Sequence, residues 1–196
     1  MKRVETFVTK CIDRGYITEE KAPWLQYALE KRITFLIAML PLLLIGTVIS
    51  SLTETIAFYI SFGMLRRYTN GIHAKNVFRC IFWSIVCEIA FLGFLTRILT
   101  LESRIILLLI SLNSIWFLAP YNHPNMALSK EEVAACAVCA KETAIQLLIV
   151  IIVLYFFAPG RLADGVLLGF IMAATMLVLT YIPKGGKQNA KQETEN

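Results

Sequence analysis

Residues 55–65 read TIAFYISFGML, an apolar stretch that polar residues bound on both sides. As a helix these eleven residues reach only about 16 Å, which is about half of the hydrocarbon thickness of roughly 30 Å. Whether the stretch crosses a bilayer decides the topology, because it decides on which side everything after it lies. We expect a thin or re-entrant segment that includes Thr53 and Glu54, thins the bilayer, or packs inside a bundle.

Five longer apolar stretches accompany this short one. They are ITFLIAMLPLLLIGTVISSL (33–52), VFRCIFWSIVCEIAFLGFL (77–95), RIILLLISLNSIWFLAP (104–120), TAIQLLIVIIVLYFFAP (143–159) and GVLLGFIMAATMLVLTYIP (165–183). Each has a length suited to a transmembrane helix, and Pro41 is expected to kink the first. The sequence thus predicts an all-α, polytopic integral membrane helical bundle with about six membrane segments, the second of them short or re-entrant.

The composition agrees with a protein that is mostly embedded in a bilayer. Of 196 residues, 57% are hydrophobic and 17% are charged, and the mean hydropathy is +0.65. These values exclude an ordinary soluble domain. We expect a single membrane domain over 1–196, with a cytoplasmic or interfacial N-terminal region at 1–32 and a flexible cytoplasmic tail at 184–196. The net charge of +5 then reflects topology and lipid headgroups, and no nucleic acid is expected as a partner.

The distribution of basic residues favours a crossing at 55–65. With both termini in the cytoplasm, the inner regions hold seven Lys/Arg in 1–32, three in 66–76, two in 121–142 and three in the tail. The outer loops hold only Arg97, Arg104 and Arg161. Cytoplasmic loops of membrane proteins carry an excess of Lys and Arg, so the sequence predicts this orientation.

The loop that follows, RRYTNGIHAKNVFRC (66–80), holds the residues best suited to catalysis. A cysteine becomes a nucleophile when a base or a positive environment converts it to a thiolate, and a histidine is such a base. His73 and Cys80 lie seven residues apart, which is roughly 10 Å along a continuous helix. A direct hydrogen bond needs about 3 Å, so the pair requires a break in the helix between them.

The loop sequence offers such a break. Asn70-Gly71 is a turn dipeptide, and Asn76 is a candidate N-cap for the helix that follows. Cys80 would then end the first helical turn, where the positive end of the helix macrodipole and Arg79 favour a thiolate. The alternative interpretation is a charged inner loop in which Cys80 is a small packing residue.

Other polar residues carry weaker hypotheses. Cys136 and Cys139 have the spacing of a redox pair or of half a zinc site, but the sequence holds no second pair, and packing of small residues on a helix is favoured. We therefore expect no metal and no cofactor. Glu88 lies inside a span, where a carboxyl group is costly unless it is paired or wet, and we expect it to contact Asn113 or Ser111 of the next span.

A polar stretch, YNHPNMALSKEEVAACAVCAKE, follows Pro120. Ser129 and, three residues later, Glu132 fit a capping box that opens a helix. The stretch predicts a separate helix of about 13 residues, packed against the bundle or lying along the inner surface.

RRYTNGIHAKNVFRC resembles the signature of the accessory gene regulator B (AgrB) family of bacterial membrane peptidases. That signature has an arginine pair with Tyr, a Gly-containing turn, His-Ala, and a Cys seven residues after the His. The resemblance extends to APYNHPNMALSKEE and to GYITEEKAPWLQYALEKR, so it covers most of the chain. Asn70 stands where a Gly often precedes the motif's Gly, and Asn76 where a Ser is common. Asn tolerates left-handed turn geometry, so the turn is retained.

The resemblance implies a membrane-embedded cysteine endopeptidase with His73 and Cys80 as the catalytic pair. In that family the Cys attacks a small AgrD-like pro-peptide from the cytoplasmic side of the plasma membrane and releases a C-terminal piece. A nucleophile within the peptide, usually a Cys, then attacks the acyl-enzyme thioester, which gives a quorum-sensing autoinducer with a (thio)lactone ring. The catalytic loop and both termini are accordingly expected in the cytoplasm.

Arg66, Arg67 and Lys75 are candidate substrate-binding residues, because they offer positive charge to an acidic tail of the pro-peptide. The positive-inside rule explains the same charges without a substrate. A homodimer is expected, since a small bundle with a short second segment needs a partner surface. The competing class is a non-enzymatic membrane transporter or export partner for a peptide. An export path needs polar residues in several spans, and the spans of this chain offer mainly Glu88, Asn113 and Gln146.

Overall fold

The computed structural model describes residues 2–69, 77–122 and 129–181. Within these ranges every regular element is a helix, which confirms the predicted all-α membrane bundle. The chain divides into two compact units, 1–45 and 46–196. A single membrane domain over the whole chain stays a prediction.

The first unit contains α1 (Lys2–Asp13), the 3-10 turn η1 (Glu19–Lys21) and the larger part of α2 (Ala22–Ile49). α2 runs unbroken from the predicted interfacial residues into the apolar stretch Leu36–Ile49, with Pro41 inside it. Pro23 is the second residue of α2. Backbone N–H groups in the first turn of a helix have no intrahelical acceptor, so a proline there costs no hydrogen bond.

Two serines separate α2 from α3 (Leu52–Thr69). The hydroxyl of Ser51 accepts the backbone N–H of Glu54 at 3.3 Å, and its carbonyl accepts the N–H of Thr55 at 2.9 Å. This is how an N-cap serine opens a helix, and Ser-x-x-Glu is a sequence signature of such a start. The prediction that the first span reaches residue 52 was therefore wrong at its end.

α3 is longer than the apolar stretch at 55–65 that predicted it. Its 18 residues give about 27 Å of helix, and they include Thr53 and Glu54, as expected, together with Arg66 and Arg67. The helices of the described part that are long and apolar enough to cross a membrane are Ile81–Ile98, Leu101–Leu118, Lys130–Phe157 and Arg161–Tyr181, with Leu36–Ile49 a shorter apolar helix. α3 is not among them, because its ends are polar.

The remaining helices follow the predicted spans with shifted ends. α4 (Val77–Glu88), the π-helical η2 (Ile89–Leu95) and α5 (Thr96–Ile98) run on from one another, and α6 (Leu101–Leu118), α7 (Lys130–Phe157) and α8 (Arg161–Tyr181) complete the second unit. The predicted capping box of Ser129 and Glu132 opens α7. The separate helix of about 13 residues was wrong, because α7 continues for 28 residues through an alanine-rich stretch without a helix breaker.

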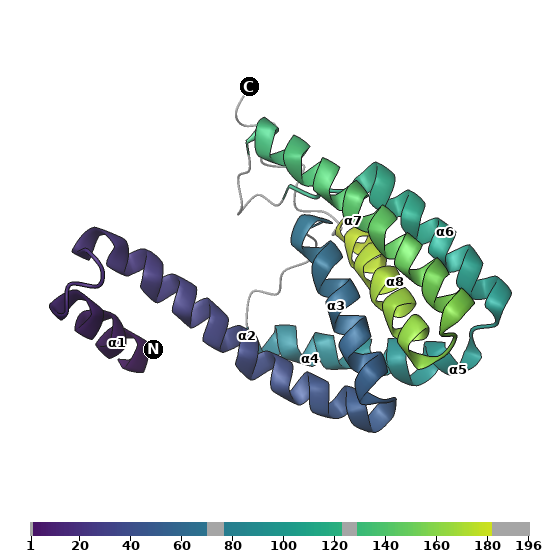
Figure 1. Cartoon of the computed structure of the whole chain (residues 1–196), viewed down its shortest axis with the longest axis horizontal. Helices are drawn as coiled ribbons and strands as arrows, with labels where there is room; N and C mark the ends of the chain where they lie inside the picture. The colour runs from purple at the N-terminus through teal and green to yellow at the C-terminus, as the bar shows by residue number, and fades with distance from the viewer. Residues whose placement is uncertain (1, 70–76, 123–128, 182–196) are drawn as a thin grey trace, which may run out of the picture. The chain divides into compact units, whose positions relative to one another are not determined.

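α8 is the central helix of the second unit. Figure 1 shows α3, α8, α7 and α6 side by side, and α8 packs against the other three. Two thirds of the residues in its apolar window are buried, against about a tenth in α6. The packing of α3 along α8 is the most extensive in the unit, while Ile56, Ile60 and Met64 on the opposite face of α3 are exposed, so α3 lies at the edge of the bundle and is not enclosed by it.

Two glycines of α8 make this packing close. A Cβ atom built on Gly165 would run into the backbone carbonyl of Glu54, and one built on Gly169 would run into the carbonyl of Phe58. The hydroxyl of Ser61 donates a hydrogen bond of 2.8 Å to the carbonyl of Val166, so the contact also satisfies a buried polar group. The pair forms the motif Gly-x-x-x-Gly, which lets helix backbones approach each other in membranes.

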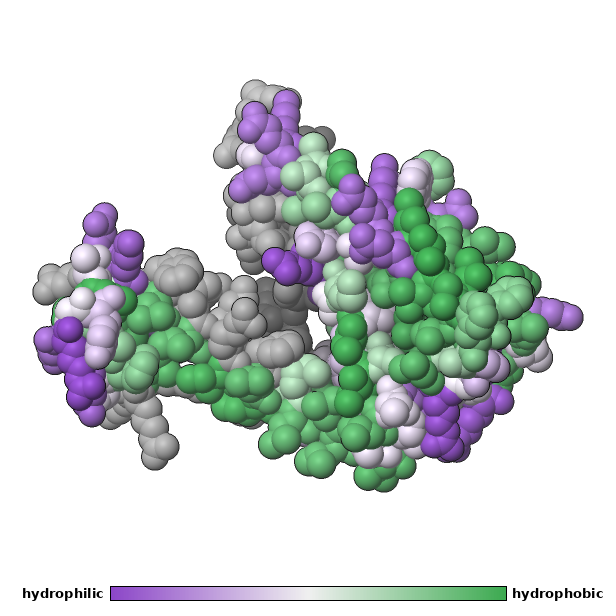
Figure 2. Space-filling model, viewed as in Figure 1, coloured by the Kyte–Doolittle hydropathy of each residue, from purple (hydrophilic) through white to green (hydrophobic). Residues whose placement is uncertain are grey.

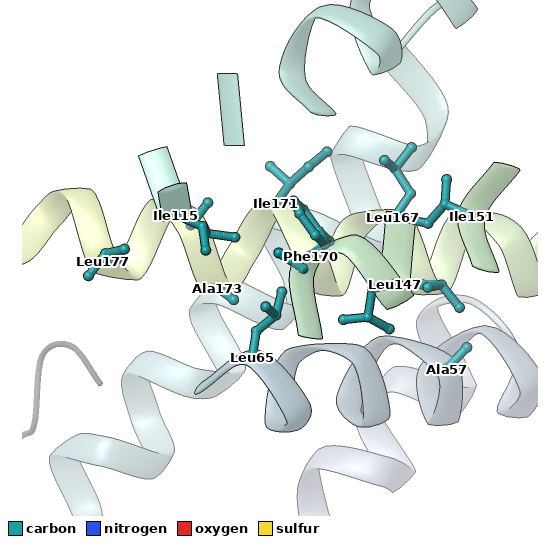
Figure 3. Packing of buried hydrophobic residues seen from close by; sticks show 13 residues of the cluster. Ala57, Leu65, Ile115, Leu147, Ile151, Leu167, Phe170, Ile171, Ala173 and Leu177 are labelled. Atoms are coloured by element: carbon teal, nitrogen blue, oxygen red, sulfur yellow. The ribbon is translucent and has the colours of Figure 1, made fainter. Parts of the chain in front are cut away.

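The apolar core lies where α8 meets its neighbours. Figure 3 shows Leu65 of α3, Ile115 of α6 and Leu147 of α7 converging on Phe170 and other side chains of α8. The outward faces of α6 and α7 carry large exposed apolar side chains: Ile105, Ile106, Leu109, Ile110, Phe117, Ile149, Val150 and Val153. Figure 2 shows this broad apolar surface with hydrophilic side chains gathered at the helix ends, as a bilayer requires.

A polar clasp joins the helices at one end of the bundle, here named the Arg104 end. The guanidinium of Arg104 pairs with Asp164 of α8 and donates to the hydroxyl of Tyr155 of α7 at 3.2 Å. Tyr155 in turn donates to Asp164 at 2.6 Å. Arg104 also donates to the carbonyls of Thr96 and Leu99, at 3.1 and 3.2 Å. Sequence reasoning treated Arg104 only as a loop charge and missed this role.

Gly169→Ala is expected to destabilise the protein by about 1–3 kcal/mol, because the added methyl group has no space against the backbone of α3. Gly63→Ala is the matched control, since a Cβ atom on Gly63 meets nothing within 4 Å and alanine is the better helix former. Thermal unfolding of the purified protein in detergent measures both. Equal melting temperatures for the two variants would contradict the close contact.

Asp164→Ala is expected to lower stability by about 1–3 kcal/mol, since it leaves the partly buried Arg104 without its carboxylate. Tyr155→Phe removes one donor and leaves the ion pair intact, so its effect is expected to be smaller. In a double-mutant cycle, Arg104→Leu with Asp164→Ala should cost less than the sum of the single changes. Strict additivity in thermal unfolding would show that the clasp does not act as a unit.

Candidate active site

The predicted catalytic residues lie at the edge of the described part. His73, Lys75, and the turn residues Asn70 and Gly71 lie outside the described residues. The backbone of Cys80 is described as part of α4, but its side chain is not. Their catalytic, substrate-binding and turn-forming roles therefore stay predictions.

The helix that carries Cys80 begins where the sequence predicted. α4 starts at Val77, so Cys80 is its fourth residue and belongs to its first turn. The first turn of a helix presents backbone N–H groups without intrahelical acceptors and carries the positive end of the macrodipole. A thiol in such a position has its thiolate form stabilised.

The chain enters the 70–80 segment from a fixed point. Thr69 ends α3, is fully buried, and its carbonyl accepts the backbone N–H of Tyr121 at 3.1 Å. The ring of Tyr121 packs edge-on against Tyr181 at 5.4 Å between centroids, and the Tyr181 hydroxyl donates to the carbonyl of Leu118 at 2.8 Å. The ends of α3, α6 and α8 thus meet at one end of the bundle, here named the Thr69 end.

The arginine pair lies in the last turn of α3, at this same end. Arg67 is exposed, and its guanidinium lies 5.6 Å from the centroid of the Tyr68 ring. Arg66 is half-buried. Positive charge at the C-terminus of a helix stabilises it through the macrodipole, so the pair supports α3 whatever else it does.

A pocket of about 370 Å³ lies beside the arginine pair, between α3 and α7. Its lining consists of Gly63, Met64, Arg67, Tyr68, Thr143 and Gln146. Sequence reasoning noted Gln146 only as a polar residue within a span. The pocket was not predicted, because it depends on which faces of α3 and α7 meet.

The expectation for Glu88 was wrong. The side-chain amide of Asn113 donates to the carbonyl of Leu109 in its own helix, at 2.8 Å. Glu88 is fully buried, and neither carboxylate oxygen has a hydrogen-bond partner among the described residues. It lies over Gly46, where an added Cβ atom would meet Glu88 Oε1 and the side chain of Thr55. The carboxyl group thus lies in the space beside Gly46, and its polar neighbour is Tyr59 of α3.

Four cysteines other than Cys80 lie among the described residues. Cys11, Cys87, Cys136 and Cys139 are free thiols and half-buried. Cys136 and Cys139 lie three residues apart on α7, as predicted for small residues on a helix. These four residues are therefore useful as matched controls for Cys80.

No solved structure and no curated protein sequence matches the chain. The sequence model of one family, accessory gene regulator B, matches residues 4–182, which is nearly the whole chain. The protein has several apolar helices that suit a multi-pass membrane protein. It therefore belongs to the accessory gene regulator B family, and this membership implies a part in processing a quorum-sensing peptide.

Proposed function

We propose that the protein is a cysteine endopeptidase that cleaves a small pro-peptide and supports its cyclisation. The observation that carries this proposal is the start of α4 at Val77, which puts Cys80 in the first turn of a helix. The macrodipole stabilises the thiolate form of a cysteine in this position, and the thiolate is the nucleophilic form. His73 is the candidate base, from the segment between α3 and α4.

The proposed reaction has two steps. The Cys80 thiolate attacks the scissile carbonyl, and His73 protonates the leaving amine, which departs with the C-terminal piece of the peptide. The acyl-enzyme thioester is then attacked by the thiol of a cysteine within the peptide, whose proton passes to His73, and Cys80 leaves as the thiolate. The new ring keeps a thioester, so the site has to exclude water while the internal attack occurs.

The proposed orientation puts the Thr69 end in the cytoplasm. This end has Arg66 and Arg67 on α3 and Lys130 and Lys141 on α7. At the opposite end Arg104 is paired with Asp164. An excess of Lys and Arg marks the cytoplasmic side of a membrane protein, so the catalytic segment and both termini are proposed to be cytoplasmic. A homodimer is part of the same proposal.

The proposal is tested by co-expression with the pro-peptide, taken as the product of a short neighbouring reading frame with an internal cysteine and an acidic end. Cys80→Ser and His73→Ala are each expected to reduce cleavage by roughly 10³-fold or more, because each removes one member of a catalytic unit. Peptide fragments are measured by mass spectrometry at equal levels of membrane-inserted protein.

The controls are Cys87→Ser, Cys136→Ser and Cys139→Ser, which remove other free thiols and should retain cleavage. Cleavage that persists in Cys80→Ser would overturn the proposal. Export of uncleaved peptide by that variant would favour the competing class, a peptide transporter or export partner.

Arg66→Glu combined with Arg67→Glu separates substrate docking from topology. If these arginines and Lys75 hold an acidic peptide tail, cleavage is expected to fall at least tenfold while the topology is retained. The combination Lys10→Glu and Lys21→Glu changes the formal charge equally at two exposed positions of the N-terminal region. Reporter fusions at the C-terminus measure the topology of both. Undiminished cleavage with retained topology would leave the positive-inside rule as the sole explanation of the arginine pair.

A further inference from the structure

The pocket between α3 and α7 is lined by several side chains that can form hydrogen bonds. Arg67, Tyr68, Thr143 and Gln146 line it, and their side-chain polar groups have no hydrogen-bond partner among the described residues. The contact of Arg67 with the Tyr68 ring leaves the guanidinium N–H groups available. Polar groups that converge on a cavity of this size are typical of a ligand site, for which roughly 300–1,000 Å³ is usual.

Gln146 gives independent support for an occupant. It lies in the apolar window of α7, where the neighbouring Ile145 and Ile149 are exposed apolar side chains. An exposed amide at such a position is costly unless something hydrogen-bonds to it. Thr143 lies one turn earlier on the same side of the helix and is buried except toward the pocket it lines. The two side chains together offer both donors and acceptors in a row along α7.

The position of the pocket indicates what the occupant is. Arg67 and Tyr68 line it, and the next residue, Thr69, is the fixed point from which the chain enters the segment with His73 and Cys80. A ligand in the pocket therefore lies beside the beginning of the proposed catalytic segment. The ligand that has to lie there during cleavage is the pro-peptide.

We propose that this pocket binds an extended stretch of the pro-peptide next to its scissile bond. Thr143 and Gln146 hydrogen-bond to the peptide backbone, whose amides need partners once they leave water. Arg67 pairs with a carboxylate of the peptide, through the forked geometry of its guanidinium. This inference rests on the proposed function and adds α7 to the elements that recognise the substrate.

Gly63 provides a way to close the pocket. A Cβ atom built on Gly63 meets nothing within 4 Å, and Gly63 lines the pocket, so a larger side chain at this position is expected to reduce the pocket volume. Gly63→Leu therefore blocks the pocket sterically. Gln146→Leu removes the amide and leaves an apolar side chain of similar bulk. The two variants test space and hydrogen bonding separately.

The test measures binding apart from cleavage. Full-length Cys80→Ser protein in lipid nanodiscs is titrated into the fluorescently labelled pro-peptide, and the Kd is compared with Gly63→Leu and Gln146→Leu made in the same background. Each is expected to weaken binding about tenfold or more. Gln146→Leu removes one or two hydrogen bonds to the peptide, and Gly63→Leu occupies the space that the peptide needs. Ile145→Leu, one residue away on α7 and outside the pocket lining, is the control and should bind normally.

Two readouts distinguish failure of this inference from failure of the proposed function. Unchanged Kd values in both pocket variants, at unchanged melting temperatures, would overturn the inference. The proposed catalytic role of Cys80 would not be affected by that result. The inference would also be overturned if the Cys80→Ser reference protein did not bind the pro-peptide. Cleavage that persists in Cys80→Ser overturns the proposed function itself. In enzyme that retains Cys80, the pocket variants are expected to raise KM more than they lower kcat.

Discussion

The second unit depends on the close approach of α3 and α8 at Gly165 and Gly169. α3 is a poor membrane helix by composition, and its buried face includes Glu54, Thr55 and Ser61. Such a face is tolerated where protein covers it, and in lipid it would be costly. The two glycines bring the backbone of α8 near enough to do so. The close contact at these glycines positions α3, the helix that leads into the proposed catalytic segment.

The two ends of the bundle differ in how their polar groups are used. At the Arg104 end, the side chains of Arg104, Tyr155 and Asp164 are hydrogen-bonded to one another, and three helices are joined. At the Thr69 end, the backbone is fixed by Thr69 and Tyr121, while the polar side chains of the pocket have no hydrogen-bond partner in the described ranges 2–69, 77–122 and 129–181. A binding site requires polar side chains that can bond to a ligand and a backbone that holds them in place before the ligand arrives.

The parts of the fold that sequence predicted well are those set by local rules. The existence of the long spans follows from their hydropathy, and the start of α7 follows from Ser129 and Glu132. The start of α3 is also set by a local signal, since Ser51-Leu52-Thr53-Glu54 is a capping signature. The prediction missed it because the first apolar span was extended to residue 52. The motif Gly165-x-x-x-Gly169 was also visible, and its significance was missed because the partner helix had to be known.

The features that sequence did not predict depend on which faces of distant helices meet. Glu88 was assigned a partner on the next span by proximity along the chain, whereas the space it fills is left by Gly46. The pocket at Gly63 and Gln146 joins residues from α3 and α7, and neither helix signals it alone. Thiol and imidazole chemistry made His73 and Cys80 candidates for a catalytic pair, the resemblance assigned them that role, and helix geometry added the requirement for a break between them.

The start of α4 relative to the membrane has one more consequence. Cys80 lies in the first turn of α4, and the helix continues through η2 and α5 to Ile98. The proposed nucleophile thus lies near one end of a helix that is long enough to span a membrane. A pro-peptide that adsorbs to the same leaflet would find it by lateral diffusion in two dimensions. Turnover would then follow the surface density of adsorbed peptide, so membrane area and lipid charge would set the output of the signal as much as peptide synthesis does.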